Sequence, residues 1–164
     1  GTCPSTAAKV TASVRKLASR PVMVKLSPNV TDIALIAKAV EEEGADALSL
    51  VNTFMGMAID IQRRKPVLGN TMGGLSGPAI RPLALRMVWQ VANAVEIPVI
   101  GMGGIDSWQS ALEFILAGAA AIAIGTGFFV NPNIAQEVNQ GLSSYMQEHG
   151  IITLNELVGA ALPG

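Results

Sequence analysis

The sequence contains very few of the residues that build disulfides, metal centres and aromatic cores. Among its 164 residues there is one cysteine, Cys3, and one histidine, His149, and aromatic residues make up only 4%. A single cysteine excludes a disulfide within the chain and a cysteine-rich metal site, and a single histidine leaves no pair for a zinc site. We expect both residues to lie at the surface, without a role in chemistry.

Charge is also scarce. Charged residues make up 14% of the chain and the net charge is −1, which argues against a nucleic-acid partner. Half of the residues are hydrophobic, a composition that excludes a disordered chain. The apolar residues are mainly aliphatic and accompany 17 glycines, as is typical of buried parallel strands, tight turns and covering helices. The length predicts one domain over residues 1–164.

One stretch without charge, residues 114–136, resembles a membrane span at first sight. Several glycines and Pro132 interrupt it, whereas a span needs about 20 consecutive apolar residues. We therefore predict the end of a helix followed by a buried strand, and no membrane partner. Residues 1–20 lack the apolar core of a secretory leader, so we expect a cytoplasmic protein.

Signals for helices and strands alternate along the chain. Strands are expected over residues 22–26, 47–51, 98–102 and 120–124. Helices are expected over residues 5–19, from a cap at Thr31 or Asp32 to Glu43, over 81–95, from a cap at Asp106 or Ser107 to Ala117, over 133–147, and in a short segment at 153–158. Residues 52–79 are expected to form a long loop. This order predicts an α/β fold with a parallel sheet and right-handed crossovers.

Four strand–helix units are half of a (β/α)8 barrel, which typically needs about 250 residues. The chain therefore suits either a small open α/β domain or the second half of a barrel. The second alternative leaves two sheet edges exposed, and we expect such edges to drive association into a homo-oligomer.

Polar groups and glycines follow the predicted strands where each strand ends. They are Lys25, the pair Asn52 and Thr53, the turn Gly103–Gly104 and the turn Gly125–Thr126. Ligands bind at this edge of barrels and of open α/β sheets alike, and glycine turns before helices favour phosphate. Each feature alone also fits an ordinary turn or a solvated lysine. Together they suit a phosphorylated cofactor better than hydrolysis, because no Ser/His/Asp triad can be assembled from these residues.

Five segments in order closely resemble the dihydroorotate dehydrogenases, and in particular the B-type, NAD-linked catalytic subunit. They are residues 24–33, 51–53, 73–80, 100–105 and 124–126. The resemblance covers essentially the whole chain and implies the C-terminal half of an FMN-binding (β/α)8 barrel. It implies oxidation of dihydroorotate to orotate in pyrimidine biosynthesis, with electrons passing to NAD through a partner subunit that carries FAD and an iron–sulfur cluster.

The resemblance also implies a role for individual residues. Lys25 would lie against the flavin ring, and Val51 and Gly77 would contact FMN. The phosphate of FMN would be bound by Gly103, Gly104, Gly125 and Thr126, and the pyrimidine substrate by Asn52 and Thr53.

The catalytic base of this family is a cysteine that the resemblance places upstream of this chain, so no catalytic residue is expected within it. Cys3 matches instead a later position, where the family has an aspartate. We therefore expect the isolated chain to be inactive. Two alternatives stay open: an FMN domain like that of dihydropyrimidine dehydrogenase, which Leu75 and Pro78 disfavour, and a non-catalytic half-barrel that binds FMN or phosphate.

Overall fold

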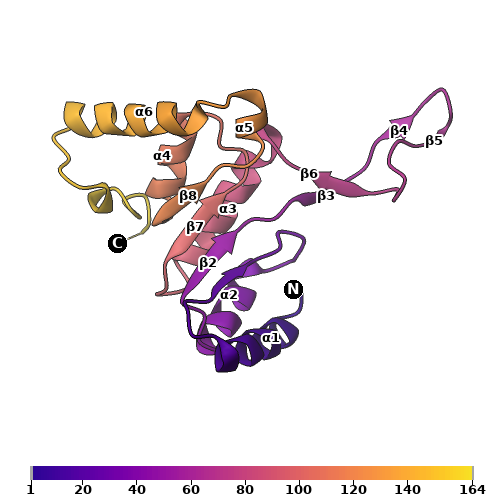
Figure 1. Ribbon diagram of the computed structural model, residues 1–164, viewed down its shortest axis with the longest axis horizontal. Coiled ribbons are helices and arrows are strands. Elements are labelled where there is room, and N and C mark those ends of the chain that lie inside the picture. The colour runs from indigo at the N-terminus through magenta and orange to yellow at the C-terminus, as the bar shows by residue number, and fades with distance from the viewer. Residues whose placement is uncertain (1, 164) are drawn as a thin grey trace.

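Four parallel strands form the central sheet of the computed structural model, which describes residues 2–163 (Figure 1). Their spatial order follows the chain: β1 (Met23–Lys25), β2 (Ala47–Leu50), β7 (Val99–Met102) and β8 (Ala121–Ala123). In the register, Val24 pairs with Leu48 and Gly101 pairs with Ile122. The predicted parallel sheet of four strand–helix units is confirmed, and it has the topology of part of a (β/α)8 barrel.

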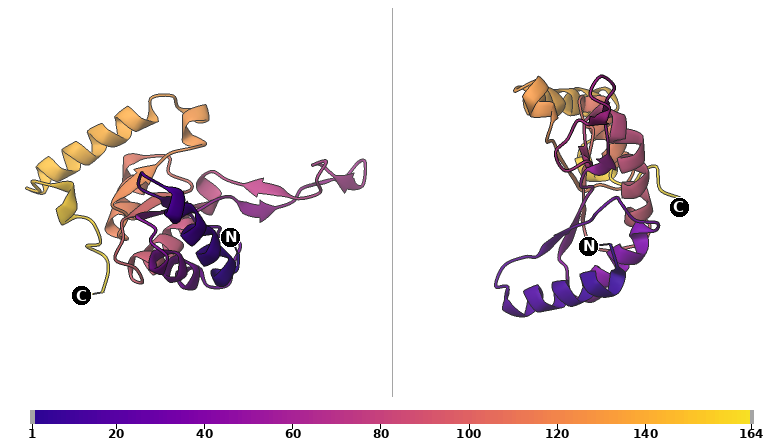
Figure 2. Two further views of the ribbon diagram at one scale, coloured as in Figure 1. Left: turned by 60° about the horizontal axis from the view of Figure 1, so that its bottom comes forward. Right: turned by 90° about the vertical axis from the view of Figure 1, so that its right-hand side faces the viewer.

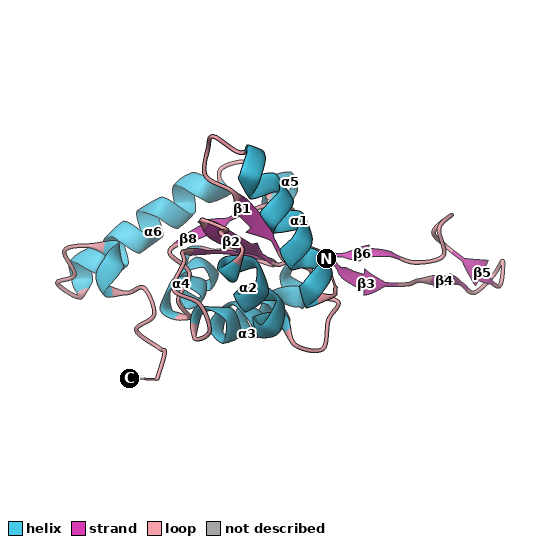
Figure 3. Ribbon diagram, turned by 90° about the horizontal axis from the view of Figure 1, so that it is seen from below, coloured by secondary structure: helices cyan, strands magenta, loops and turns pink. Residues whose placement is uncertain are grey.

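The helices that connect these strands lie along one side of the sheet (Figure 3). The long helices are α1 (Pro4–Leu17), α2 (Ile33–Glu42), α3 (Arg81–Ala92), α4 (Trp108–Leu116) and α6 (Ile134–Glu148). Shorter helical segments are η1 (Pro78–Ile80), α5 (Gly127–Val130) and η2 (Leu154–Glu156). The predicted caps are confirmed where Asp32 accepts hydrogen bonds from the N–H groups of Ala34 and Leu35, and where Ser107 caps α4.

The core lies between the sheet and these helices. Leu48 and Leu50 of β2 are fully buried, as are Val88 of α3 and Phe114 of α4. Strand β7 alternates between buried residues and half-exposed ones, so only one of its faces is covered. Ser49, between Leu48 and Leu50, is also buried, so β2 is buried on both faces and β7 on one.

The two outer strands of the sheet, β1 and β8, each pair with one neighbour. The expected pair of exposed sheet edges is thus present within the described residues. Such edges offer unpaired backbone groups to another segment of chain.

The expected long loop over residues 52–79 is a wrong prediction, because most of it forms a paired arm. Strand β3 (Phe54–Gly56) pairs antiparallel with β6 (Gly73–Leu75), and β4 (Ile59–Asp60) pairs with β5 (Lys65–Pro66). We call residues 54–75 the arm. It projects away from the sheet and its helices (Figure 2), and it carries Arg63 and Arg64, both exposed, between β4 and β5.

Within residues 2–163, no helix has the length and apolar character needed to cross a membrane. The stretch 114–136 instead contains the end of α4, strand β8 and the short α5.

Candidate functional site

A groove of about 270 Å³ opens at the carboxyl ends of the four strands. It brings together every site residue expected from the sequence: Lys25, Val51, Asn52, Thr53, Gly77, Gly103, Gly104, Gly125 and Thr126. Segments up to about a hundred positions apart in the chain thus meet at one edge, as a parallel sheet requires. The groove also includes residues that were not singled out from the sequence, namely Ser76, Ile80, Met102, Ile105, Ala123 and Ile124.

Backbone hydrogen bonds fix the strand ends that carry these residues. The N–H of Val51 donates to the carbonyl of Met102 over 3.0 Å, and the N–H of Asn52 donates to the carbonyl of Leu26 over 3.2 Å. Hydrogen bonding therefore continues past the end of β2, through Val51 to β7 and through Asn52 to the residue after β1. Lys25, at the end of edge strand β1, is exposed and forms no ion pair within residues 2–163. Its ammonium group is available to a ligand.

The amide of Asn29 fixes the segment that carries Thr53. Its Nδ2 donates to the carbonyl of Thr53 over 3.1 Å, and its Oδ1 accepts from the N–H of Met55 over 2.9 Å. The Oδ1 of Asn52 also accepts from the N–H of Thr53 over 2.9 Å. Asn29 therefore ties the base of the arm to the loop after β1. Its role was not foreseen, although it lies within the first segment of the resemblance.

Two glycines bring the wall of the groove into close backbone contact. Gly104 has φ +79°, and a Cβ there would lie 2.8 Å from the carbonyl oxygen of Gly77 and 2.9 Å from the backbone nitrogen of Arg81. A side chain at this position would force the two segments apart. Only glycine allows the turn after β7 to touch the segment before α3.

The Cα positions of two glycines in the groove, Gly77 and Gly125, border open space. A Cβ at Gly77 or at Gly125 would meet no atom within 4 Å. Both residues lie in the wall of the groove, so their missing side chains leave room there. Glycine at such positions lets a ligand approach the backbone closely.

Several backbone donors at the groove have no acceptor in the part of the chain that the structure describes. They are the N–H groups of Gly103, Gly104, Gly125 and Thr126. Clustered N–H groups of this kind form concave sites for anions. Near the start of α4 some donors are already used: the hydroxyl of Ser110 accepts from the N–H groups of Asp106 and Ser107, and the hydroxyl of Ser107 accepts from the N–H of Ser110.

The single cysteine lies outside the groove. Cys3 is exposed at the start of α1, where the hydroxyl of Ser5 is the main cause that lowers the pKa of the thiol to about 7. His149 is exposed at the end of α6 and stacks on Tyr145 with ring centroids 4.1 Å apart. The expected surface positions of both residues are confirmed. Across residues 2–163, no cluster of histidine, cysteine or acidic residues could hold a metal ion.

The chain has the architecture of part of an α/β barrel, and its glycine turns meet at the carboxyl edge of the sheet, where such barrels bind their ligands. The chain belongs to the dihydroorotate dehydrogenase family, whose family model matches residues 1–146.

Three curated relatives carry the name "Dihydroorotate dehydrogenase B (NAD(+)), catalytic subunit". The protein of Desulforamulus reducens is 64% identical over 95% of this chain and 51% of its own length. Those of Trichlorobacter lovleyi and Pelobacter propionicus are 59% and 56% identical, each over 98% of this chain and 53% of their own length. The chain therefore spans about half the length of the curated relatives it matches.

Proposed function

We propose that the chain forms part of a flavin-dependent dihydroorotate dehydrogenase of the B type and that its groove holds FMN. The observation that carries this proposal is the convergence of the residues expected to bind FMN and substrate in one groove. The names of relatives 56% to 64% identical to this chain support the same reaction. The reaction is the oxidation of dihydroorotate to orotate.

The residues of the groove fit FMN at its phosphate end. The free N–H groups of Gly103, Gly104, Gly125 and Thr126 offer donors to a phosphate, and no carboxylate lies in the wall of the groove. The open space at Gly77 and Gly125 lets a ligand reach the backbone. We propose that the two glycine turns hold the phosphate and that Val51 and Gly77 contact the rest of the cofactor.

Bound FMN supplies the acceptor for the hydride that leaves dihydroorotate. In this proposal Lys25 places a positive charge beside the flavin ring, which stabilises the negative charge of the reduced ring. Asn52 and Thr53 offer an amide and a hydroxyl to the polar edge of the pyrimidine. The hydrogen bonds that Asn29 makes to Thr53 and Met55 keep this segment in place.

The base that removes the substrate proton is a cysteine that this chain does not place in the groove. Cys3, its one cysteine, is absent from the groove wall. We propose that the missing base belongs to the part of the relatives that this chain does not match. The chain by itself then binds flavin but turns over no dihydroorotate.

The family resemblance further supports a partner subunit that carries FAD and an iron–sulfur cluster and passes electrons to NAD, in the cytoplasm. No cluster of cysteine ligands for iron and sulfur can form in a chain with one cysteine. The free edges of β1 and β8 support association with a second copy or with the rest of a barrel. A single monomeric species in light scattering would contradict this association.

The decisive experiment is to titrate the purified chain with FMN and follow the visible absorbance of the flavin. We expect binding that is weakened in the Lys25→Met variant and unaffected in Lys38→Met, which removes the same charge from the exposed side of α2. A folded chain that leaves the flavin spectrum unchanged would contradict the proposed site. Dihydroorotate with a dye acceptor then tests turnover, and formation of orotate by the isolated chain would contradict the assignment of the base.

A further inference from the structure

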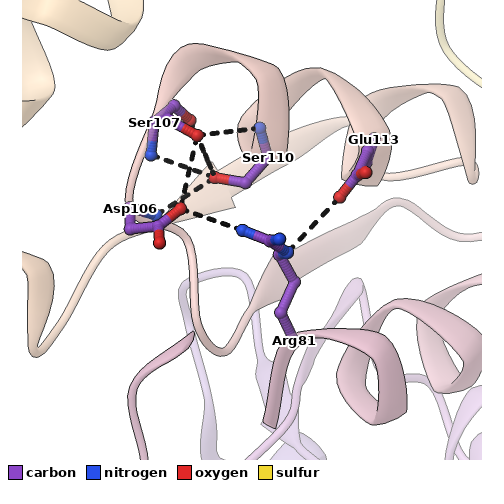
Figure 4. Close-up of polar contacts among 5 residues, drawn as sticks. All are labelled: Arg81, Asp106, Ser107, Ser110 and Glu113. Atoms are coloured by element: carbon purple, nitrogen blue, oxygen red, sulfur yellow. Dashed lines mark hydrogen bonds and ion pairs between the residues drawn. The ribbon is translucent and has the colours of Figure 1, made fainter. Parts of the chain in front are cut away.

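A charged network joins the start of α3 to α4 and to the turn before it (Figure 4). Arg81 is the first residue of α3, and its Nη1 donates to Oδ1 of Asp106 over 3.0 Å. Its Nε lies 3.6 Å from Oε2 of Glu113 on α4. One guanidinium group therefore joins the start of α3 to the turn before α4 and to the middle of α4.

Both ends of the Arg81–Asp106 ion pair lie next to groove residues in the chain. Arg81 follows Gly77 by four positions, through the short segment η1. Asp106 follows Gly104 by two positions. The same two segments also meet where Gly104 approaches the carbonyl of Gly77 and the backbone nitrogen of Arg81.

The serines at the start of α4 hold Asp106 on the other side. The buried hydroxyl of Ser110 accepts from the N–H groups of Asp106 and Ser107, over 3.0 Å each. The hydroxyl of Ser107 lies 3.3 Å from the Asp106 carboxylate and can donate to it. The aspartate is thus fixed at its backbone and at its carboxylate, so its pairing with Arg81 determines where the turn lies relative to α3.

The charges of this network also bear on an anion in the groove. Arg81 faces two carboxylates, those of Asp106 and Glu113. Without the guanidinium, the uncompensated carboxylate of Asp106 would lie two residues from the Gly103–Gly104 turn in the wall of the groove. Like charges at such distances repel even near a protein surface.

We propose that Arg81 is a positioning residue for the phosphate site, and that it acts through Asp106 by holding the Gly103–Gly104 turn against Gly77. This inference rests on the proposed binding of FMN for its functional consequence. The positioning itself is independent of any ligand. None of the atoms of Arg81 needs to touch the cofactor.

Hydrogen exchange of the free chain tests the positioning directly. In Arg81→Met we expect the amides of Asp106 and Ser107, which donate to Ser110 at the end of the turn, to exchange about fivefold faster, the change for an ion pair of half-exposed groups, while amides of β1 and β2 keep their rates. The matched control is Arg86→Met, which removes an exposed arginine from the same helix. Unchanged exchange at Asp106 and Ser107 would overturn the proposal.

Flavin titrations then separate positioning of the phosphate site from a general loss of structure. We expect Arg81→Met to bind FMN about fivefold more weakly, with no change for riboflavin, which lacks the phosphate. Adding Asp106→Asn to Arg81→Met should recover part of the loss, because it removes the unpaired carboxylate. An equal loss for FMN and riboflavin would overturn the proposal. Failure of the unaltered chain to bind FMN would instead count against the proposed function, and the exchange rates would still decide whether the ion pair holds the turn.

Discussion

The body formed by the sheet and its helices and the arm of residues 54–75 are both rich in apolar side chains, yet they use them in opposite ways. In the body, Leu48, Val88 and Phe114 are fully buried. In the arm, eight large apolar side chains are at least 45% exposed: Met55, Met57, Ile59, Ile61, Val67, Leu68, Met72 and Leu75. A two-stranded ribbon has no second layer to cover its faces, so apolar residues alone do not produce a core.

The largest contrast between the two regions is expected from truncating one apolar side chain in each. Phe114→Ala removes a fully buried ring that packs beside Gly101, and should lower the free energy of unfolding by about 3–5 kcal/mol. Ile61→Ala removes a side chain that is 78% exposed and should change it by less than about 0.5 kcal/mol. Urea denaturation measures both. Similar losses would show that the arm is packed in solution.

A comparison of two glycines is expected to give the next largest effect. Gly104→Ala puts a Cβ within 3 Å of the backbone of Gly77 and Arg81 at a positive φ, and should cost about 1–3 kcal/mol of stability. Gly69→Ala in the arm meets no atom within 4 Å and should be neutral. The difference in melting temperature between the variants reports this effect. A neutral Gly104→Ala would mean that the two segments separate easily.

Asn29 is the side chain that links the body to the arm, and its removal should have a smaller effect. Asn29→Ala removes two hydrogen bonds, to Thr53 and Met55, and should lower the free energy of unfolding by about 1 kcal/mol. We expect faster proteolysis within the arm. The control is Asn70→Ala, in which the lost amide forms no side-chain hydrogen bond in the described part of the chain. Equal cleavage of both variants would show that Asn29 does not hold the arm.

The smallest expected effect concerns pH and lies in the body, near its C-terminal end. The N–H of Thr153 donates to the Glu156 carboxylate over 2.8 Å and is the main cause that holds the pKa of Glu156 below its usual range. A lowered pKa contributes stability above the pKa of the unfolded chain, and this contribution is lost as the pH falls through the folded-state pKa. Glu156→Gln should therefore reduce the slope of stability against pH below about pH 4.5. If the free energy of unfolding of Glu156→Gln and of the unaltered chain falls equally at acid pH, this prediction is wrong.

The body was predictable because its signals are local. The aspartate before α2, the serine before α4 and the apolar runs of the four strands each act within a few residues of chain, and each was confirmed in place. The convergence of Lys25, Asn52 and the glycine turns followed from parallel topology, since that topology puts all carboxyl ends at one edge.

The arm and the network behind the groove were not predictable from such signals. Strand β6 begins with Gly73 and Gly74, which resemble a turn in sequence, and its pairing with β3 crosses about twenty residues. The contact of Arg81 with Asp106 joins two helix starts that only the packed structure brings together. The exposure of Lys25 follows from its place on the edge strand β1, which has no further strand beside it in the sheet of the described residues.

The sequential strand order of the sheet has a consequence for how the groove is made during synthesis. Each of the strands β2, β7 and β8 pairs with the sheet strand that precedes it in the chain. Each can therefore pair with a strand that the ribosome has already released. Residues 25–126 contain the whole groove, and it is complete once β8 has joined the sheet. The arm lies between β2 and β7 in the chain and lengthens the loop that must close before β7 can pair with β2. We therefore expect the arm to delay the addition of β7 to the sheet.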